Sequence, residues 1–384
     1  MGHIASTTRF ASKVKSKKPI LSICVPTHDR LFYLDCLIES IRLSEFKGHE
    51  IEILISNDAS TDQTKTYLDD LVKEKVLHPC LKVVHQTKKR DWMEHMMELP
   101  LMASGVYVWI IGDDDLLMPG AVDFVLAFLK REKPDVLLLN KIVKSHDLRN
   151  TLKPRQHTLD GPAEFSSLID MACRFGILTE IGFTSCLIFR REPVVEEDPW
   201  PWLNTRSIYA QTFRLFPAFR SAKCIAVDNL CVVHRQNNQR SDQTDAPFYE
   251  ALERIPHALL LLHALNVADR WQLNSILEEE RPDSDESTTL LTRLLSIING
   301  YPELIAKIKA SQIGCWRQLC EQSKSMYVQK IFSQIKEKLL SDENGKKDEA
   351  TILQKKRISV LFKTKREALR IASNLKSFLN KRRI

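Results

Sequence analysis

Three consecutive aspartates, Asp113, Asp114 and Asp115, have the types and spacing that most clearly indicate chemistry. They follow the apolar run VYVWII at residues 106–111, which is typical of a buried β-strand. Three adjacent carboxylates repel one another, and a neighbouring cation relieves that repulsion. Their oxygens suit hard divalent ions such as Mn²⁺ or Mg²⁺, which also bind phosphates. The aspartates therefore predict a divalent metal site, and the alternative is an exposed turn that caps the next helix.

Two further polar clusters each follow an apolar run. The cluster PTHDR at residues 26–30 follows ILSICV, and NDASTD at residues 57–62 follows IEILIS. Neighbouring parallel strands end at the same edge of a sheet, and open α/β sheets bind their ligands outside that edge. We therefore expect all three clusters to meet in one crevice.

The elements that must position these clusters alternate between strand and helix over residues 19–140. This alternation predicts an α/β fold with a mostly parallel central sheet and flanking helices. Pro26 is expected to end the first strand, and Pro119 to lie in the first turn of a helix. The expected strands span residues 20–25, 51–56, 81–85, 106–111 and 136–139, and the expected helices 33–43, 62–71, 92–102 and 119–131.

Beyond residue 140 the alternation weakens, with strand-like runs at 185–189 and 225–233, and from residue 246 the pattern is helical. The expected organisation is a basic flexible arm (1–18), an α/β domain (19–245) with halves at 19–140 and 141–245, a helical region (246–350) and a basic amphipathic tail (351–384).

The positive charge of the chain is concentrated in the tail. The formal net charge is +7, and residues 351–384 hold eleven Lys or Arg and one Glu, so +11 − 1 = +10 lies there and 7 − 10 = −3 on the rest. This distribution does not predict nucleic-acid binding. A basic amphipathic segment either binds an anionic membrane surface or packs on the chain or on a homodimer partner.

The remaining composition is that of a globular protein, with 43% hydrophobic and 27% charged residues. No apolar run reaches the roughly 20 residues of a spanning helix, and the N-terminus has no secretory h-region. The nine cysteines form no CxxC pair and are expected to be free thiols in a reducing compartment. We therefore expect a cytoplasmic protein, peripheral at the inner face of the membrane if the tail binds there.

Taken in order, the three clusters resemble the motifs of the inverting family 2 glycosyltransferases, which have the Rossmann-like GT-A fold. PILSICVPTHDR resembles the opening strand and loop of the family, and IEILISNDASTDQT its second element. ASGVYVWIIGDDDLLMPGAV resembles its metal-binding DxD element, in the form found in enzymes of bacterial surface-polysaccharide synthesis. The resemblance covers residues 19–140 and continues more faintly to about residue 240.

The resemblance implies a metal-dependent enzyme that moves a sugar from a nucleotide-diphosphate sugar to a hydroxyl of a glycan or lipid-linked acceptor. Asp58 would accept from the nucleotide base, whereas Asn57 replaces the first of two family acids. The alternative for Asp58 is an N-cap of the helix at 62–71. The implied donor-binding residues are Pro26, Thr27, Arg30, Asn57, Asp58, Asp113 and Asp114, and the implied metal ligands are Asp114, Asp115 and His234.

The resemblance also implies a general base, which inverting transfer needs to deprotonate the acceptor. The matching stretch, WLNTRSIYAQTFR at residues 202–214, contains no acid. Just upstream lie Glu196, Glu197 and Asp198, of which Asp198 is our candidate base, and the alternative is a solvated acidic loop. Two other functions stay open. One is a nucleotidyltransferase, although residues 26–30 lack the glycine-rich loop expected of it, and the other is a GT-A protein that binds without turnover.

Overall fold

The computed structural model describes residues 18–44, 50–77 and 79–236, together with residues 258, 259, 262, 265–269, 272 and 333. Residues 1–17 of the predicted arm, nearly all of the predicted helical region 246–350 and the whole predicted tail 351–384 lie outside the described residues.

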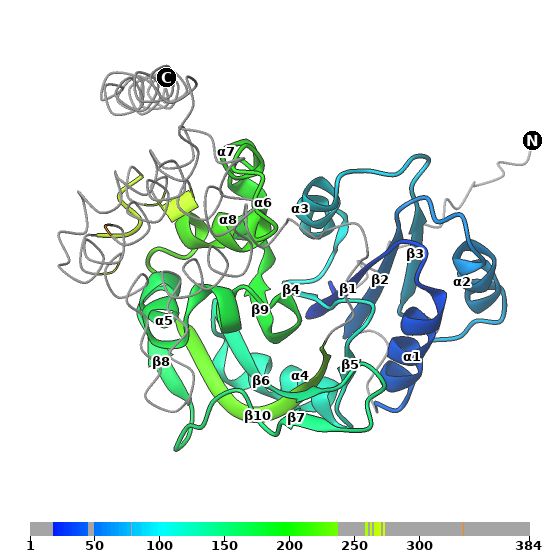
Figure 1. The fold of residues 1–384 in the computed structure, drawn as a ribbon, viewed down its shortest axis with the longest axis horizontal. Coiled ribbons are helices and arrows are strands. Elements are labelled where there is room, and N and C mark those ends of the chain that lie inside the picture. Colours follow the sequence, from blue (N-terminus) through cyan, green and yellow to red (C-terminus); the bar gives the residue numbers. More distant parts are fainter. Residues whose placement is uncertain are drawn as a thin grey trace, which may run out of the picture.

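The described strands form one sheet in the order β3-β2-β1-β4-β9-β6-β10-β5, with β7 beside β6 and β8 beside β10 (Figure 1). Strands β1, β2, β3, β4, β6 and β10 run in one direction, and β5, β7, β8 and β9 run in the other. The bounds are β1 Leu21–Thr27, β2 Ile51–Asn57, β3 Leu81–His85, β4 Tyr107–Ile110, β5 Leu116–Leu117, β6 Val136–Lys144, β7 Thr151–Lys153, β8 Ala163–Phe165, β9 Leu187–Arg190 and β10 Cys224–Arg235.

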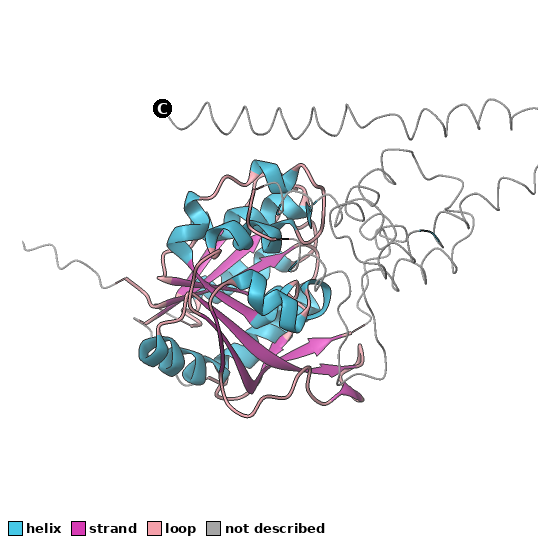
Figure 2. Cartoon of the chain, turned by 90° about the vertical axis from the view of Figure 1, so that its left-hand side faces the viewer, coloured by secondary structure: helices cyan, strands magenta, loops and turns pink. Residues whose placement is uncertain are grey.

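Helices lie on both sides of this sheet, which confirms the predicted architecture (Figure 2). Helices α1 and α2 flank β1 to β3, while α3, α6, α7 and α8 gather together (Figure 1). The bounds are α1 Leu31–Arg42, α2 Thr64–Lys73, α3 Trp92–Met102, α4 Ala121–Glu132, α5 Leu168–Phe175, α6 Arg191–Glu196, α7 Trp200–Leu203 and α8 Ala210–Ala218.

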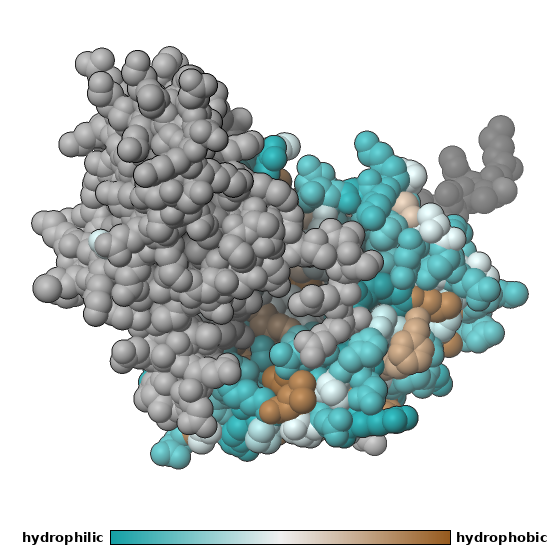
Figure 3. All heavy atoms as spheres, in the orientation of Figure 1, coloured by the Kyte–Doolittle hydropathy of each residue, from teal (hydrophilic) through white to brown (hydrophobic). Residues whose placement is uncertain are grey.

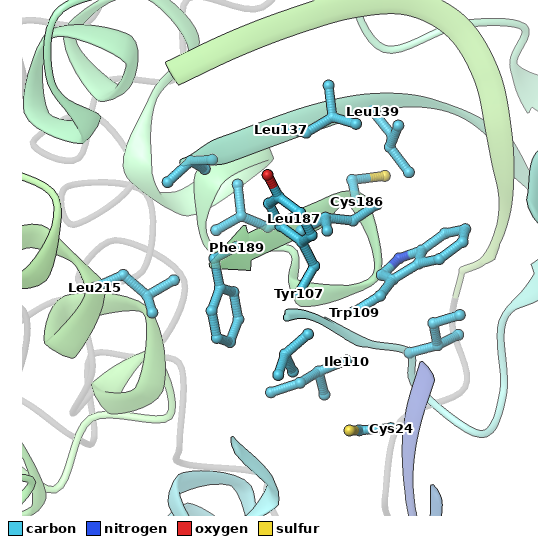
Figure 4. Packing of buried hydrophobic residues seen from close by; sticks show 14 of the residues in the cluster. Cys24, Tyr107, Trp109, Ile110, Leu137, Leu139, Cys186, Leu187, Phe189 and Leu215 are labelled. Carbon is cyan, nitrogen blue, oxygen red and sulfur yellow. The ribbon is translucent and has the colours of Figure 1, made fainter. Parts of the chain in front are cut away.

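The core follows the apolar runs of the sequence. Every residue of β1 and β2 is buried, as expected of strands covered on both faces. Farther along the sheet, Trp109 is fully buried and its indole Nε1 donates to the backbone oxygen of Ser185 at 2.8 Å. Figure 4 shows Tyr107 and Trp109 of β4 packed beside Leu187 and Phe189 of β9. This packing joins the two halves of the sheet.

Two predictions about prolines were wrong. Pro26 does not end β1, which continues to Thr27. The backbone oxygen of Cys24 accepts from the nitrogen of Ile111, so the backbone groups of Cys24 face β4. Because this orientation repeats every second residue, the nitrogen of Pro26 also faces the β4 side. It lies beyond the end of β4 at Ile110, where no strand needs an N–H donor. Pro119 precedes α4, because Gly120 has a φ of +77°, which no α-helix contains.

The second half of the sheet differs more from the expectation. The predicted strand 185–189 begins only at Leu187, because residues 184–186 form a 3₁₀ turn that follows a π-helical turn at Ile177–Ile181. Strand β10 extends to Arg235, so His234 and Arg235 belong to it. The short strands β5, β7 and β8 were not expected, since two or three residues carry too little periodicity to predict a strand.

The described surface carries no sign of a membrane span or of a disulfide. Within the described residues, no helix combines the length and the apolar character needed to cross a membrane. The seven described cysteines are all free thiols, as expected. On the face drawn in Figure 3, the described surface is mainly hydrophilic, with small separate apolar patches.

Candidate active site

The acidic loop, residues 112–115, connects β4 to β5. Asp113 and Asp115 are buried, whereas the carboxylate of Asp114 is 28% exposed. The loop is held by the backbone nitrogen of Gly112, which donates to Ser185 Oγ at 2.9 Å. Helix α4 starts six residues after Asp115 and no side chain caps it, so the aspartates are not an exposed cap.

The residues that follow β1 contact this loop directly. Thr27 Oγ1 donates to Asp113 Oδ2 at 2.8 Å, and Arg30 Nη2 donates to Asp114 Oδ2 at 2.8 Å. Arg30 Nε lies 2.9 Å from Asp113 Oδ1 as an ion pair, although its alignment does not make a hydrogen bond. The predicted meeting of these two clusters is therefore present. The guanidinium of Arg30 also supplies part of the positive charge that we expected a metal ion to supply.

A second guanidinium lies on the other side of the loop. Arg235 Nε donates to the backbone oxygen of Asp114 at 3.1 Å, and Nη1 donates to the backbone oxygen of His146 at 2.8 Å. The two guanidinium carbons lie 4.9 Å (Arg30) and 5.2 Å (Arg235) from the centre of the Tyr33 ring. These cation–π contacts hold two positive charges beside the acidic loop.

Strand pairing brings His234 to Asp115. Strands β5 and β10 are antiparallel with Leu117 opposite Val232 and Leu116 opposite Val233, so the same register continues to Asp115 opposite His234. His234 Nδ1 lies 3.2 Å from Asp115 Oδ1, and the ring of Phe183 packs edge-on against the imidazole with centroids 4.5 Å apart. Two predicted metal ligands therefore lie side by side.

The third cluster contacts the residues at the end of β1 through its backbone. The backbone nitrogen of Asp58 donates to the oxygen of Thr27 at 2.9 Å, and His28 Nδ1 lies 2.8 Å from the oxygen of Asp58. The Asp58 carboxylate accepts from the backbone nitrogen of Arg90 at 3.1 and 3.2 Å and does not cap α2. Asn57 Nδ2 lies 3.0 Å from His85 Nδ1.

Asp29, which the sequence did not single out, ties the loops together. Its carboxylate accepts from the backbone nitrogens of Thr61 at 2.5 Å and Asp62 at 3.2 Å, and its own nitrogen donates to Ser60 Oγ. Burial alone would raise the pKa of this carboxyl, but these N–H donors and the charge of His28 lower it below its usual value. Asp29 has a φ of +51°, a left-handed conformation that Asp adopts more readily than most residues. An Asp shortly after the end of a strand is therefore the sequence feature that could have indicated this turn.

The donor set around the loop fits a divalent ion only in part. Among the described residues, no three His, Cys, Asp or Glu side chains make up a complete metal site. Asp114 and Asp115 nevertheless lie in the acidic loop, and His234 contacts Asp115. Mg²⁺-type sites often use one or two carboxylates and take their other ligands from water and substrate phosphates. The residues therefore suit an ion whose coordination a bound diphosphate completes.

The candidate base lies at the junction of α6 and α7, which belong to the group of helices around α3 (Figure 1). Asp198 Oδ1 accepts from the backbone nitrogen of Trp200, the first residue of α7, at 3.1 Å. Beside it, burial raises the pKa of Glu197, and the charges of Asp198 and Glu196 raise it further, against Arg220 and Arg214. The acidic segment is thus only partly solvated, and the role of Asp198 stays a prediction.

Residues 22–196 match the family model described as glycosyl transferase family 2. The chain therefore contains a family 2 glycosyltransferase domain. This transferase is 23% identical over 278 residues to the abequosyltransferase RfbV of Salmonella typhimurium, covering 68% of this chain and 81% of RfbV. Over 113 residues it is 32% identical to the GalNAc(5)-diNAcBac-PP-undecaprenol beta-1,3-glucosyltransferase of Campylobacter jejuni, covering 28% of this chain and only 34% of that enzyme.

Solved structures agree on the fold of the transferase. TarS of S. aureus, residues 1–349 in complex with UDP-GlcNAc, superposes with a TM-score of 0.50 at 18% identity, covering 81% of this chain and 83% of TarS. Full TarS gives a TM-score of 0.51 at 17% identity, covering 81% of this chain and 50% of TarS. The central sheet with flanking helices is therefore the GT-A fold.

Proposed function

We propose that this glycosyltransferase takes a nucleoside-diphosphate sugar as donor, requires Mn²⁺ or Mg²⁺, and transfers the sugar with inversion to a hydroxyl of a glycan or lipid-linked acceptor. The observation that carries the proposal is the contact of Thr27 and Arg30 with the acidic loop. It joins the end of β1, where a nucleotide would lie, to the carboxylates that would hold the metal.

The charges around the loop match those of a diphosphate leaving group. Arg30 and Arg235 can each donate to phosphate oxygens, and Arg235 Nη2 is buried with no protein partner in the described structure. Asp114, Asp115 and His234 would hold the metal, which when bound stabilises the negative charge that develops on the leaving diphosphate. Asp113 would face the ribose.

The nucleoside would lie over the loops that Asp29 joins. Pro26 is the last residue but one of β1, Asn57 ends the neighbouring strand β2, and the Asp58 carboxylate accepts from the backbone nitrogen of Arg90. An amide at Asn57 can bond a base or ribose edge as the usual family acid would. RfbV and the Campylobacter enzyme, whose names specify an abequosyl transfer and an undecaprenol-linked glycan, support surface-polysaccharide synthesis in the cytoplasm at the membrane face.

A thermal-shift screen with Asp114→Ala tests the donor and metal together. A ligand that binds only the folded state stabilises it by about 2.7 kcal/mol at a hundred times its dissociation constant. We expect a nucleoside diphosphate to raise the Tm of the wild type when Mn²⁺ or Mg²⁺ is present, and not when EDTA replaces the ion. Asp114→Ala should lose this metal-dependent rise and all sugar transfer.

The matched control is Asp123→Ala, which removes a carboxylate from the outer part of α4 and should leave the rise unchanged. If Asp114→Ala keeps the wild-type metal dependence, the aspartates are structural and the proposed site is wrong. Donor binding without any donor consumption would instead favour a protein that binds sugar nucleotides and does not turn them over.

A further inference from the structure

The ring of Tyr33 lies against both arginines that flank the acidic loop. The guanidinium carbon of Arg30 is 4.9 Å from the centre of this ring, and that of Arg235 is 5.2 Å from it. Arg30 contacts the carboxylates of Asp113 and Asp114 from the end of β1, whereas Arg235 contacts the backbone oxygen of Asp114 from β10. The ring therefore joins two cations that come to the loop from different halves of the chain.

The position of the ring follows from the start of α1. The backbone nitrogen of Tyr33 donates to the backbone oxygen of Arg30 at 3.0 Å, and residues three apart at a helix turn lie on the same side. The next residue, Leu34, is fully buried and anchors the helix in the core. The ring of His146 packs edge-on against Tyr33 with centroids 6.1 Å apart, and its backbone oxygen accepts from Arg235 at 2.8 Å. The ring is thus fixed from both segments that it contacts.

The contact with the ring stabilises the two cations without using their hydrogen-bond donors. The face of an aromatic ring is electrically negative, so it attracts the guanidinium groups and offsets the repulsion between them. A guanidinium that packs on a ring keeps its N–H groups available. The side chain of Arg30 is 14% exposed and that of Asp114 28%, so this part of the loop is open to solvent, whereas Arg235 is buried. Arg30 can therefore exchange a carboxylate for a phosphate while the ring still holds it.

We infer that Tyr33 is a positioning residue for the diphosphate of the donor, because its ring holds the two guanidinium groups beside the acidic loop. The inference rests on the proposed function, which places the diphosphate there. The ring contributes its electrostatic attraction for the cations, and neither its bulk nor its hydroxyl group is what the diphosphate requires. A tyrosine that only packed α1 against its neighbours would affect stability and leave the recognition of phosphate charge unchanged.

Titration of the full chain with nucleoside diphosphates and monophosphates, in the presence of Mn²⁺ or Mg²⁺, tests this role. UDP, GDP, CDP and dTDP are each compared with the corresponding monophosphate, and the pair that binds the wild type most tightly is kept for the variants. The ratio of the two dissociation constants measures what the second phosphate contributes. Changes in the contacts of the nucleoside cancel in this ratio.

The variants are Tyr33→Leu, which removes the ring, and Tyr33→Phe, which keeps it. Tyr67→Leu is the matched control, because Tyr67 of α2 also holds α1, through a hydrogen bond from its hydroxyl to Asp35 Oδ1 at 2.7 Å. We expect Tyr33→Leu to lower the preference for the diphosphate about tenfold, which is the size of effect that partly desolvated cation–π contacts produce. Tyr33→Phe and Tyr67→Leu should keep the preference within about twofold of the wild type.

Fluorinated phenylalanines at position 33 separate the charge of the ring from its shape. Each added fluorine makes the face of the ring less negative and changes its volume little. The preference for the diphosphate should therefore fall with each fluorine, whereas a packing role would leave it constant. This series also replaces Tyr33→Leu if that variant does not fold, because every member keeps an aromatic ring.

An unchanged preference in folded Tyr33→Leu, or a constant preference across the fluorinated series, would overturn the inference. Equal losses of monophosphate and diphosphate affinity would also overturn it, since the ring would then support the nucleoside site. In each of these cases a wild type that binds the diphosphate with the metal ion leaves the proposed function standing. If the wild type binds no nucleoside diphosphate with either ion, the proposed function fails, and the inference fails with it.

Discussion

The carboxylates of the acidic loop have partners within the chain itself. Arg30 lies against Asp113 and Asp114, and His234 and the backbone nitrogen of Arg235 lie against Asp115. Under the proposed function, a metal and a diphosphate that bind here would redistribute these contacts, and Arg30 would turn from carboxylate to phosphate. This coupling is the physical reason to test the ion and the nucleotide together.

The three adjacent acids at residues 196–198 allow a test of which residue is the general base. The base must be ionised to accept the acceptor proton, and its loss typically costs about 10²–10⁴ in rate. We expect Asp198→Asn to lower turnover at least a hundredfold with donor affinity unchanged, measured by steady-state kinetics and nucleotide titration. The side-chain oxygen of asparagine can still accept from the backbone nitrogen of Trp200, so the loss would not report a disturbed turn before α7.

Glu196→Gln is the matched control, since Glu196 is exposed in the same segment and should turn over normally. Near-normal turnover of Asp198→Asn with a large loss in Glu197→Gln would transfer the role to Glu197. The pH profile separates the two, because activity falls as pH drops through the pKa of the base. Burial raises the pKa of Glu197. With Glu197 as the base, activity would therefore fall at a higher pH than expected for a glutamate with the usual pKa.

The position of the acids could be predicted from the sequence, but their partners could not. Apolar runs that end in polar clusters mark the carboxyl ends of strands, and Thr27, Asp58 and Asp113 do lie at one edge of the sheet. His234 is 119 residues from Asp115, and Ser185 is 73 residues from Gly112. Those contacts depend on the register of β5 with β10 and on a 3₁₀ turn, neither of which leaves a local pattern in the sequence.

Among the elements, the turn from α3 into β4 shows how closely the strands approach. The backbone nitrogen of Gly105 donates to Ser22 Oγ at 2.8 Å, and Ser22 Oγ donates to the buried carboxylate of Glu52 at 2.5 Å. The nitrogen of Ser104 also donates to Glu52, at 2.8 Å. This network joins β1, β2 and β4, and it leaves room only for glycine at position 105.

Gly105→Ala should therefore destabilise the fold. A Cβ at this position would lie 2.7 Å from the backbone nitrogen of Ser22 and 2.9 Å from the backbone carbon of Leu21, so the strand itself would have to move. Overpacking of this kind typically costs about 1–3 kcal/mol. Urea denaturation followed by circular dichroism measures the loss. Ser104→Ala, which adds no atom in the adjacent position, should cost much less, and equal costs would contradict the steric explanation.

The elements of the first half were more predictable than those of the second because their partners follow them in sequence. The predicted bounds 81–85 and 92–102 are those of β3 and α3. After residue 140, β9 inserts antiparallel between β4 and β6, which no local periodicity indicates. The roles of the two prolines also could not be predicted from local patterns. Pro26 stays within β1 because it lies beyond the end of the neighbouring strand β4, and α4 starts only after Gly120 because that residue has a left-handed conformation.

Over the whole molecule, the described sheet brings residues from both halves of the chain to the acidic loop. Thr27 and Arg30 reach it from the end of β1, and Ser185, His234 and Arg235 reach it from the second half. The proposed acceptor is a glycan or is lipid-linked, and a lipid-linked acceptor would be presented at a membrane surface. None of the described helices could span a membrane. The positive charge of residues 351–384 is the feature of the chain that could hold the enzyme at that surface.

We expect removal of residues 351–384 to weaken binding to anionic vesicles while sugar transfer to a soluble acceptor persists. The segment carries a net charge of +11 − 1 = +10, and each basic residue near an anionic surface contributes about 1 kcal/mol before salt screens it. Co-sedimentation with phosphatidylserine vesicles at low and high salt measures the effect, with phosphatidylcholine vesicles as the neutral comparison. A full-length variant with Lys376, Lys381, Arg382 and Arg383 changed to glutamine keeps the length and the apolar residues, so it isolates charge. It should bind with intermediate strength and a shallower salt dependence. Equal binding by all three proteins at low salt would show that the tail packs elsewhere.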